Sequence, residues 1–333
     1  MRGVLVYSER ESVALELLTF ATSLAQPVAV ALLGQDAAAW AESCFAHGAQ
    51  RAYTCADPSL TDPQADVLSE ALAQIVKQAG VDVILIGSTL RGREVASRLA
   101  QKLEAGCITD AIGLRAEYGG GAEYGGGAEN GQLIATRYAL GGNTISTEVI
   151  QSMPSPGGDL WQVIAVMPRT FEAKPLGTGN SGQVIETALR LTPSPVKVVE
   201  RRAKPAGSVN VESAEALVCI GRGVGAQKDV DMIQALANAL GGVVCCTRPI
   251  SHDRHWLPED QMVGISGKMS SPRLYLGIGV SGQIQHAVGV MGSKVTVAIN
   301  SDKNAPIFKL ADYGVVGDLY QVVPKLTEKL KAR

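Results

Sequence analysis

At 333 residues, the chain is long enough for two domains, each with a hydrophobic core of its own. Its formal net charge of −2 argues against nucleic acid and anionic membrane surfaces as partners, because both attract strongly basic proteins. No apolar run reaches the roughly 20 residues that a membrane-crossing helix needs, and charged residues follow Met1 too soon for a signal peptide. We therefore expect a cytoplasmic protein without membrane insertion.

The first half of the chain alternates between short apolar runs and amphipathic helical patterns. The runs are rich in β-branched residues and leucine, which is typical of strands buried on both faces. Strands are expected at residues 4–7, 28–33, 83–87, 133–138 and 164–168, and helices at residues 13–26, 64–79 and 88–103. This alternation predicts a parallel sheet with helices on both sides.

Two local features of this half have more than one interpretation. Arg91 and Arg93 lie near the start of an expected helix, where they either bind an anion or, as we expect, belong to a solvated first turn. Residues 116–127 read Ala-Glu-Tyr-Gly-Gly-Gly twice. Because so many glycines disfavour both helix and strand, we expect a lengthened, mobile hairpin loop there without a direct function.

The composition changes between residues 174 and 205, where Gly, Pro and Ser become frequent and a basic run occupies residues 200–204. Such a stretch is typical of an interdomain linker. We expect an N-terminal domain over residues 1–200, with its last strand at residues 164–168, and a C-terminal domain over residues 205–333.

The strand–helix alternation starts again after Val211. Strands are expected at residues 217–220, 243–246, 274–278, 295–300 and around Val315, and helices at residues 229–240 and 318–331. The chain is therefore predicted to be an α/β protein of two domains with mainly parallel, doubly wound sheets. Such sheets bind ligands beyond the carboxyl ends of their strands, and nearly every glycine-rich motif of the second domain falls at such an end.

The most informative motif follows the apolar run that ends at Ile278. Gly277, Gly279 and Gly282 fit the pattern G-x-G-x-x-G, and Asp302 lies about twenty residues further on. Glycines allow a tight turn and a close approach of a diphosphate to the backbone, and the start of a helix offers free N–H groups. The motif predicts a Rossmann-like nucleotide site, with a nicotinamide dinucleotide as one candidate ligand.

Charged residues follow two other expected strands of this domain. Arg222 lies between glycines, and Arg248 comes after Thr247 at the end of a strand. Either guanidinium is suited to a phosphate, although each is equally able to pair with a surface carboxylate. Pro249 stiffens the turn behind Arg248, which favours a guanidinium held in place.

Polar residues in the remaining turns have simple explanations of their own. Ser266 lies two residues after Gly264 in a turn, where its hydroxyl can reach a ligand. His286 lies one turn into the expected helix, and Asn300 ends a strand with an amide that can donate to a phosphate or an adenine. Asp318 is sufficiently explained as a helix cap.

Other kinds of chemistry find little support. His252 and His255 have the spacing H-x-x-H, but no further ligand lies near them in the sequence, so no metal is expected. Cys245 and Cys246 are adjacent and would form a disulfide only with strain. No nucleophile or acid–base motif stands out. This combination indicates a protein that holds a redox cofactor and leaves the chemistry to it.

In this order, the motifs resemble the alpha subunit of electron-transfer flavoprotein, densely over residues 218–330 and more loosely over residues 1–200. The resemblance implies a C-terminal domain that binds FAD and an N-terminal domain that docks an electron-transfer flavoprotein beta subunit. The cofactor-binding residues that it implies are Arg222, Thr247, Arg248, Gly264, Ser266, Gly279, Val280, Ser281, Gly282, Gln283, Gln285, His286, Asn300 and Asp318.

The resemblance also implies roles around the flavin ring. Arg248 would lie against the ring, Ser266 would form a hydrogen bond near N5, and His286 would donate one to the O2 edge. Such groups favour the negative charge that reduction brings to the ring, hence an anionic semiquinone and transfer of single electrons. Many members of the family have Gln-Thr where this chain has Ile265-Ser266, so the hydroxyl is kept and the amide is lost.

The sequence Val263-Gly-Ile-Ser-Gly resembles a branch of the family associated with acyl-CoA, carnitine and nitrogen-fixation metabolism, in which some members bifurcate electrons. The resemblance implies a redox carrier, not a stand-alone enzyme. It would run between an acyl-CoA dehydrogenase-type flavoenzyme and a quinone oxidoreductase or ferredoxin-linked acceptor. Three alternatives stay open: a bifurcating version of this complex, a nicotinamide-dependent dehydrogenase, and a nucleotide-binding sensor or scaffold without redox function.

Overall fold

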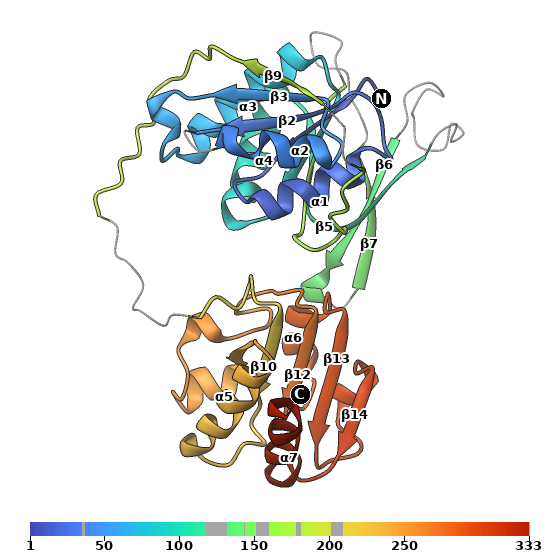
Figure 1. Cartoon of the computed structure of the whole chain (residues 1–333), viewed down its shortest axis with the longest axis vertical. Helices are drawn as coiled ribbons and strands as arrows, with labels where there is room; N and C mark the ends of the chain where they lie inside the picture. The colour runs from blue at the N-terminus through green and yellow to red at the C-terminus, as the bar shows by residue number, and fades with distance from the viewer. Residues whose placement is uncertain are drawn as a thin grey trace. The chain divides into compact units, whose positions relative to one another are not determined.

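The computed structural model describes residues 1–34, 37–117, 132–142, 144–150, 160–177, 181–200 and 209–332. The chain divides into two compact units, which comprise residues 1–138 with 145–201 and residues 139–144 with 202–333. Figure 1 shows that each unit contains a sheet flanked by helices. Among the described residues, no helix is both long and apolar enough to cross a membrane.

The first unit is built on a nine-stranded sheet with the order β7-β6-β5-β8-β4-β1-β2-β3-β9. Its strands are β1 (Val4–Tyr7), β2 (Val28–Leu33), β3 (Arg51–Cys55), β4 (Val83–Gly87), β5 (Gly106–Glu117), β6 (Gln132–Ala139), β7 (Thr144–Val149), β8 (Gln162–Val166) and β9 (Gln183–Glu186). Adjacent strands in the part of the order that runs β5-β8-β4-β1-β2-β3-β9 are parallel, whereas β5 and β6 pair in the antiparallel direction. The predicted parallel α/β sheet is confirmed, with an antiparallel hairpin at one edge.

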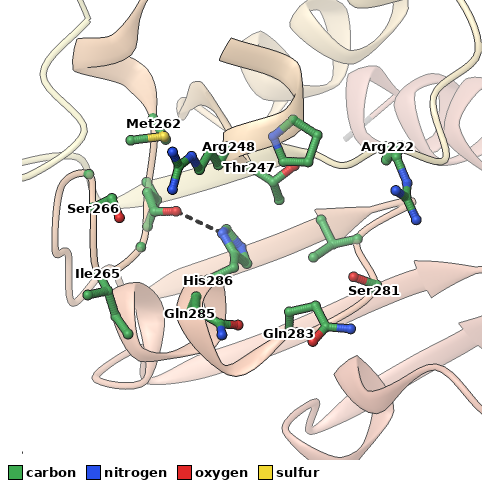
Figure 2. Close-up of a pocket in the computed structure, with 15 residues that line it drawn as sticks. Arg222, Thr247, Arg248, Met262, Ile265, Ser266, Ser281, Gln283, Gln285 and His286 are labelled. Carbon is green, nitrogen blue, oxygen red and sulfur yellow. Dashed lines mark hydrogen bonds between the residues drawn. The ribbon is translucent and has the colours of Figure 1, made fainter. Parts of the chain in front are cut away.

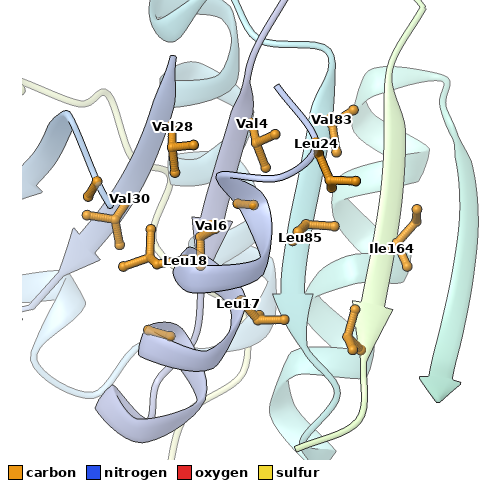
Figure 3. Packing of buried hydrophobic residues seen from close by; sticks show 14 of the residues in the cluster. Val4, Val6, Leu17, Leu18, Leu24, Val28, Val30, Val83, Leu85 and Ile164 are labelled. Atoms are coloured by element: carbon orange, nitrogen blue, oxygen red, sulfur yellow. The ribbon is translucent and has the colours of Figure 1, made fainter. Parts of the chain in front are cut away.

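Helices cover both faces of this sheet. They are α1 (Glu11–Ala21), α2 (Ala41–Ala46), α3 (Ala65–Ala79) and α4 (Leu90–Leu103). Because successive side chains of a strand point to opposite faces, Val4 packs with Leu17 in the core under α1 and α2, whereas Leu5 packs with Leu68 in the core under α3 and α4. Figure 3 shows the first of these two cores.

Several elements differ from the sequence-based expectation. The apolar pattern did not predict β3, β5 and β7, because each of these strands mixes polar or charged residues with short apolar stretches. The helix expected at residues 13–26 ends at Ala21, although Leu24 beyond it is still buried in the core. Both differences arise because tertiary packing decides where an element begins and ends.

The stretch expected to be a linker contributes a strand to the first sheet. β9 pairs in parallel with β3, so the prediction that residues 164–168 form the last strand is wrong. After β9, Leu189 and Leu191 pack against the core, and the Thr192 N–H donates to the Glu70 carboxylate at 2.9 Å. Because three of its four residues are exposed, β9 lacks the apolar pattern of the central strands.

Two further expectations fall partly outside the described residues. Most of the repeat at residues 116–127 is outside them, but β5 and β6 on either side of it pair as a hairpin requires. The basic run at residues 200–204 lies outside them apart from its first residue.

The Arg93 guanidinium lies 3.4 Å from the Asp110 carboxylate, so this arginine forms an ion pair within the protein.

The second unit has a five-stranded, entirely parallel sheet with the order β11-β10-β12-β13-β14. Its elements are β10 (Ala216–Ile220), α5 (Val230–Ala239), β11 (Val243–Cys246), β12 (Leu274–Ile278), α6 (Ile284–Ala287), β13 (Val295–Asn300), β14 (Tyr313–Val316) and α7 (Leu319–Lys331). The chain runs from β10 outward to β11 and returns to the other side of β10 at β12. A topological switch point therefore lies between β10 and β12, as expected for a Rossmann-like fold.

The two faces of this second sheet are covered by different elements. Ile220 packs with Ile233 of α5 on one face, whereas the other face is covered mainly by loops, including that of Val263. Cys246 belongs to the first of these cores and Cys245 to the second, so the adjacent cysteines point away from each other. All six cysteines of the chain are free.

The hydroxyl group of Tyr320 ties α7 to the loop that follows β10. It accepts a hydrogen bond from the Gly225 N–H at 2.8 Å and donates one to the Asp229 carboxylate at 2.6 Å. Since these groups are solvent-exposed, we expect Tyr320→Phe to lower the free energy of unfolding of this unit by only about 1 kcal/mol. Thermal unfolding measures the change, with Tyr313→Phe as the control because Tyr313 is 67% exposed. Equal melting temperatures of the two variants would refute this role of Tyr320.

Candidate functional site

A pocket of about 530 Å³ lies at the carboxyl ends of β10, β11 and β12, at the switch point of the second sheet (Figure 2). Its lining residues are Arg222, Thr247, Arg248, Pro249, Met262, Val263, Gly264, Ile265, Ser266, Gly267, Val280, Ser281, Gln283, Gln285 and His286. The pocket thus brings together ten of the fourteen residues named from the sequence. Doubly wound sheets bind nucleotides at this place.

Two glycine turns next to the pocket are held together by direct contact between their backbones. A Cβ on Gly221 would lie 2.2 Å from the Gly279 carbonyl oxygen, and a Cβ on Gly279 would lie 2.9 Å from the Gly223 Cα. Gly279 also has a φ of +61°, which disfavours any residue with a side chain. The Gly223 N–H donates to the Gly279 carbonyl at 3.0 Å. These contacts hold the turns after β10 and β12 together, which places Arg222 and Ser281 at the same pocket.

The pocket carries positive charge. Arg222 and Arg248 are exposed at it, and none of its fifteen lining residues is Asp or Glu. Within the described part of the chain, no ion pair engages either guanidinium. Such a pair of cations suits an anionic ligand such as a nucleotide, because a guanidinium can bind a phosphate with two hydrogen bonds and can also stack on a flat ring.

The loop of residues 263–267 forms one wall of the pocket and is clamped to α6. The Ile265 N–H donates to the Gln285 carbonyl at 2.8 Å, and a Cβ on Gly264 would lie 2.6 Å from the same oxygen. The side chain of Ile265 is 45% exposed at the pocket, and Ser266 is exposed beside it. The wall therefore offers an apolar surface and a hydroxyl group side by side.

His286 lines the pocket, but its ring is bound on both sides by the protein. Nδ1 lies 2.9 Å from the Val263 carbonyl oxygen (dashed line in Figure 2), and Nε2 lies 2.7 Å from the Tyr275 hydroxyl oxygen and 3.6 Å from the Cys219 sulfur. Burial lowers the pKa of the ring, but Cys219 and the Val263 carbonyl raise it by more. A ligand would have to share or replace one of these partners to receive a hydrogen bond from the ring.

The four predicted site residues that do not line the pocket have structural tasks. Gly279 forms the turn described above, and Gly282 has a φ of +83° and approaches the Ile307 backbone. The Asn300 amide donates to the Val280 carbonyl at 2.8 Å, which fixes the turn after β12. Asp318 caps α7 by accepting a hydrogen bond from the Tyr320 N–H at 2.9 Å.

Asp302, the acidic residue of the dinucleotide-binding pattern, forms its hydrogen bond outside the pocket. Asp302 does not line the pocket, and its carboxylate accepts a hydrogen bond from the Asn304 N–H at 2.9 Å. Gly277 lies inside β12, not in the turn. His252 lies 3.6 Å from the Glu259 carboxylate, and the part of the chain that the structure describes contains no cluster of three metal-ligating side chains.

Some lining residues were not predicted from the sequence. Met262 and Ile265 are apolar residues next to the predicted polar ones, and only their place in the loop brings them to the pocket. The sequence signal that could have identified both residues is their position close to Gly264.

Fold and pocket together define a nucleotide-binding protein with a positively charged site at the switch point of its second sheet. Residues 4–191 match the family model described as electron transfer flavoprotein domain, and residues 210–291 match the electron transfer flavoprotein FAD-binding domain. The chain is 34% identical to the electron transfer flavoprotein subunit alpha of Thermoanaerobacterium thermosaccharolyticum, over 96% of this chain and 93% of that protein. The corresponding figures are 33%, 90% and 86% for the Bacillus subtilis subunit alpha, and 30%, 98% and 97% for protein FixB of Escherichia coli O127:H6.

The chain belongs to the electron-transfer flavoprotein alpha-subunit family. Its C-terminal domain is the FAD-binding domain of that family. The residues present fit FAD, because the pocket is lined by two guanidinium groups that form no ion pair with the described residues, and by no carboxylate.

Proposed function

We propose that this chain is the FAD-carrying alpha subunit of a heterodimeric electron carrier in the cytoplasm. It takes electrons from an acyl-CoA dehydrogenase-type flavoenzyme and passes them to a quinone oxidoreductase or a ferredoxin-linked acceptor. Residues 205–333 hold FAD, and residues 1–200 dock the electron-transfer flavoprotein beta subunit. The family and the cofactor support this proposal, and the pocket at residues 222–286 is the observation that carries it.

The pocket suggests how its residues act on FAD. Arg222 and Arg248 supply positive charge for the diphosphate and for the flavin ring, and the hydroxyl of Ser266 lies beside the apolar Ile265, where a flavin ring can pack. His286 donates to the O2 edge only if a partner of its ring is exchanged. FAD supplies the redox chemistry, and these residues bind it, orient it and favour negative charge on it.

The alternatives have less support in the site. A nicotinamide-dependent dehydrogenase would use Asp302 for the ribose of its dinucleotide, but Asp302 does not line the pocket. A sensor or scaffold without redox function would also need cations for a phosphate, so replacement of Arg248 distinguishes it: a carrier's flavin potential should change, whereas a sensor should show no redox effect. Bifurcation depends on the beta subunit, and a second flavin there would make the complex a bifurcating one.

The test is to purify the chain with the beta subunit encoded beside it and to reduce the complex stepwise with dithionite. We expect flavin absorbance and electron uptake in two separate one-electron steps. One flavin per heterodimer would support a simple carrier, and two would support bifurcation. A colourless complex that binds no added FAD would refute the proposal.

A further inference from the structure

A cluster of buried polar side chains lies behind the wall of the pocket. Tyr275 and Cys219 are fully buried, and both approach the same atom, Nε2 of His286, at 2.7 and 3.6 Å. Cys245 pairs with Cys219 across β10 and β11, and its thiol reaches that of Cys219. Of these four side chains, only that of His286 lines the pocket.

The partners of the ring fix where its protons lie. The Val263 carbonyl can only accept, so Nδ1 of His286 carries a proton in every arrangement. In a neutral ring, Nε2 is then an acceptor, and it receives the proton of either the Tyr275 hydroxyl or the Cys219 thiol. Burial raises the pKa of Tyr275, which keeps this residue a phenol.

We propose that Cys219, Tyr275 and His286 form a buried proton relay, in which Cys219 supplies the proton that charges His286 when negative charge enters the pocket. In the first arrangement, the thiol and the phenol are protonated and the ring is neutral. In the second, Cys219 is a thiolate and His286 an imidazolium. Tyr275 stays a phenol in both arrangements, because its hydrogen bond with Cys219 lets it take the thiol proton as it gives its own proton to Nε2. One proton changes place, none comes from solvent, and the net charge of the relay is unchanged.

Opposing effects set the free-energy difference between the two arrangements. Burial raises the pKa of Cys219, but the hydrogen bond with Cys245 and the nearby ring of His286 lower it to about 5. The contact with Cys219 raises the pKa of His286, whereas burial of the ring lowers it. Burial thus favours the neutral arrangement, and the mutual contact favours the ion pair.

Proton transfer along the relay moves positive charge toward the pocket. His286 lines the pocket and Cys219 does not, so proton transfer places the positive end of the pair next to the ligand. Negative charge in the pocket therefore favours the charged ring. This inference rests on the proposed function, because FAD gains negative charge on reduction.

The experiment compares infrared spectra of the full chain, loaded with FAD, before and after photoreduction. Cys219→Ala identifies the S–H band of Cys219 by its loss. We expect that band to weaken in the wild-type protein on reduction, while ¹⁵N NMR shows His286 gaining a proton at Nε2. We also expect Cys219→Ala to lower the affinity for reduced FAD relative to oxidised FAD about tenfold, a fall of about 30 mV for the two-electron couple.

Cys246→Ala is the matched control, because Cys246 is an equally buried cysteine whose side chain lies on the opposite face of the same sheet. It should leave the Cys219 band change and the potential as in the wild type. Cys219→Ser keeps the size of the side chain and replaces the thiol with a hydroxyl that is far less acidic, so it guards against misfolding and should lower the potential as Cys219→Ala does. An unchanged Cys219 band in a protein that binds and reduces FAD would overturn the relay alone. Failure to bind FAD at all would overturn the proposed function as well.

Discussion

Gly279→Ala is expected to weaken FAD binding roughly hundredfold, which corresponds to about 3 kcal/mol. Alanine costs about 1–2 kcal/mol at the left-handed φ of Gly279, and its Cβ would lie 2.9 Å from the Gly223 Cα. Since that neighbour is backbone, the turns after β10 and β12 have to move apart, and Arg222 moves with them. Titration of FAD into the variant measures the affinity, and thermal unfolding measures the loss of stability.

Gly241→Ala separates the two causes. Gly241 lies in the same unit with a φ of +63°, but a Cβ there would meet no atom within 4 Å. It should lose the same conformational free energy while keeping its affinity for FAD. If both variants bind FAD as the wild type does, the contact between the turns is not needed for the site.

Arg248→Ala is expected to weaken FAD binding by about ten- to a hundredfold, because a hydrogen bond to a charged group contributes about 1.5–3 kcal/mol. The flavin potential should also fall, since a cation near the ring favours its reduced, negatively charged form. Arg248→Lys should recover part of the potential but less of the affinity, because lysine keeps the charge without the planar fork. Spectroscopic titration against a reference dye measures the potential.

Arg273→Ala is the control for the loss of a positive charge from the same unit. Arg273 is exposed directly before β12, at the amino end of the strand, and lies 3.9 Å from the Glu215 carboxylate. It should change neither the affinity nor the potential. Equal effects of the two variants would mean that the net charge of the unit matters, and not the position of Arg248.

The central strands were predictable because they are buried on both faces. Val4–Tyr7 and Val83–Gly87 are continuous apolar runs, which few other structures explain. β9 is an edge strand that only its partner β3 defines, so no local pattern reveals it. Local composition therefore indicates the middle of the sheet much better than its edges.

The same contrast holds for the site. The rule that ligands lie beyond strand ends was sufficient to bring Arg222 and Arg248 together. It did not distinguish them from Asn300 and Asp318, which also follow strands but hold turns and a helix end. Cys219 and Tyr275 lie inside strands, where an apolar pattern conceals that their polar atoms meet at His286.

The parallel pairing of β9 with β3 determines where this protein can be cut. A fragment that stops at Pro168 would leave the backbone groups along one edge of β3 without partners and uncover the apolar surface beneath Leu189 and Leu191. Open strand edges of this kind recruit other chains and lead to aggregation. Expression of the first unit by itself should therefore extend through Ser194, whose hydroxyl donates to the Asp66 carboxylate at 2.8 Å.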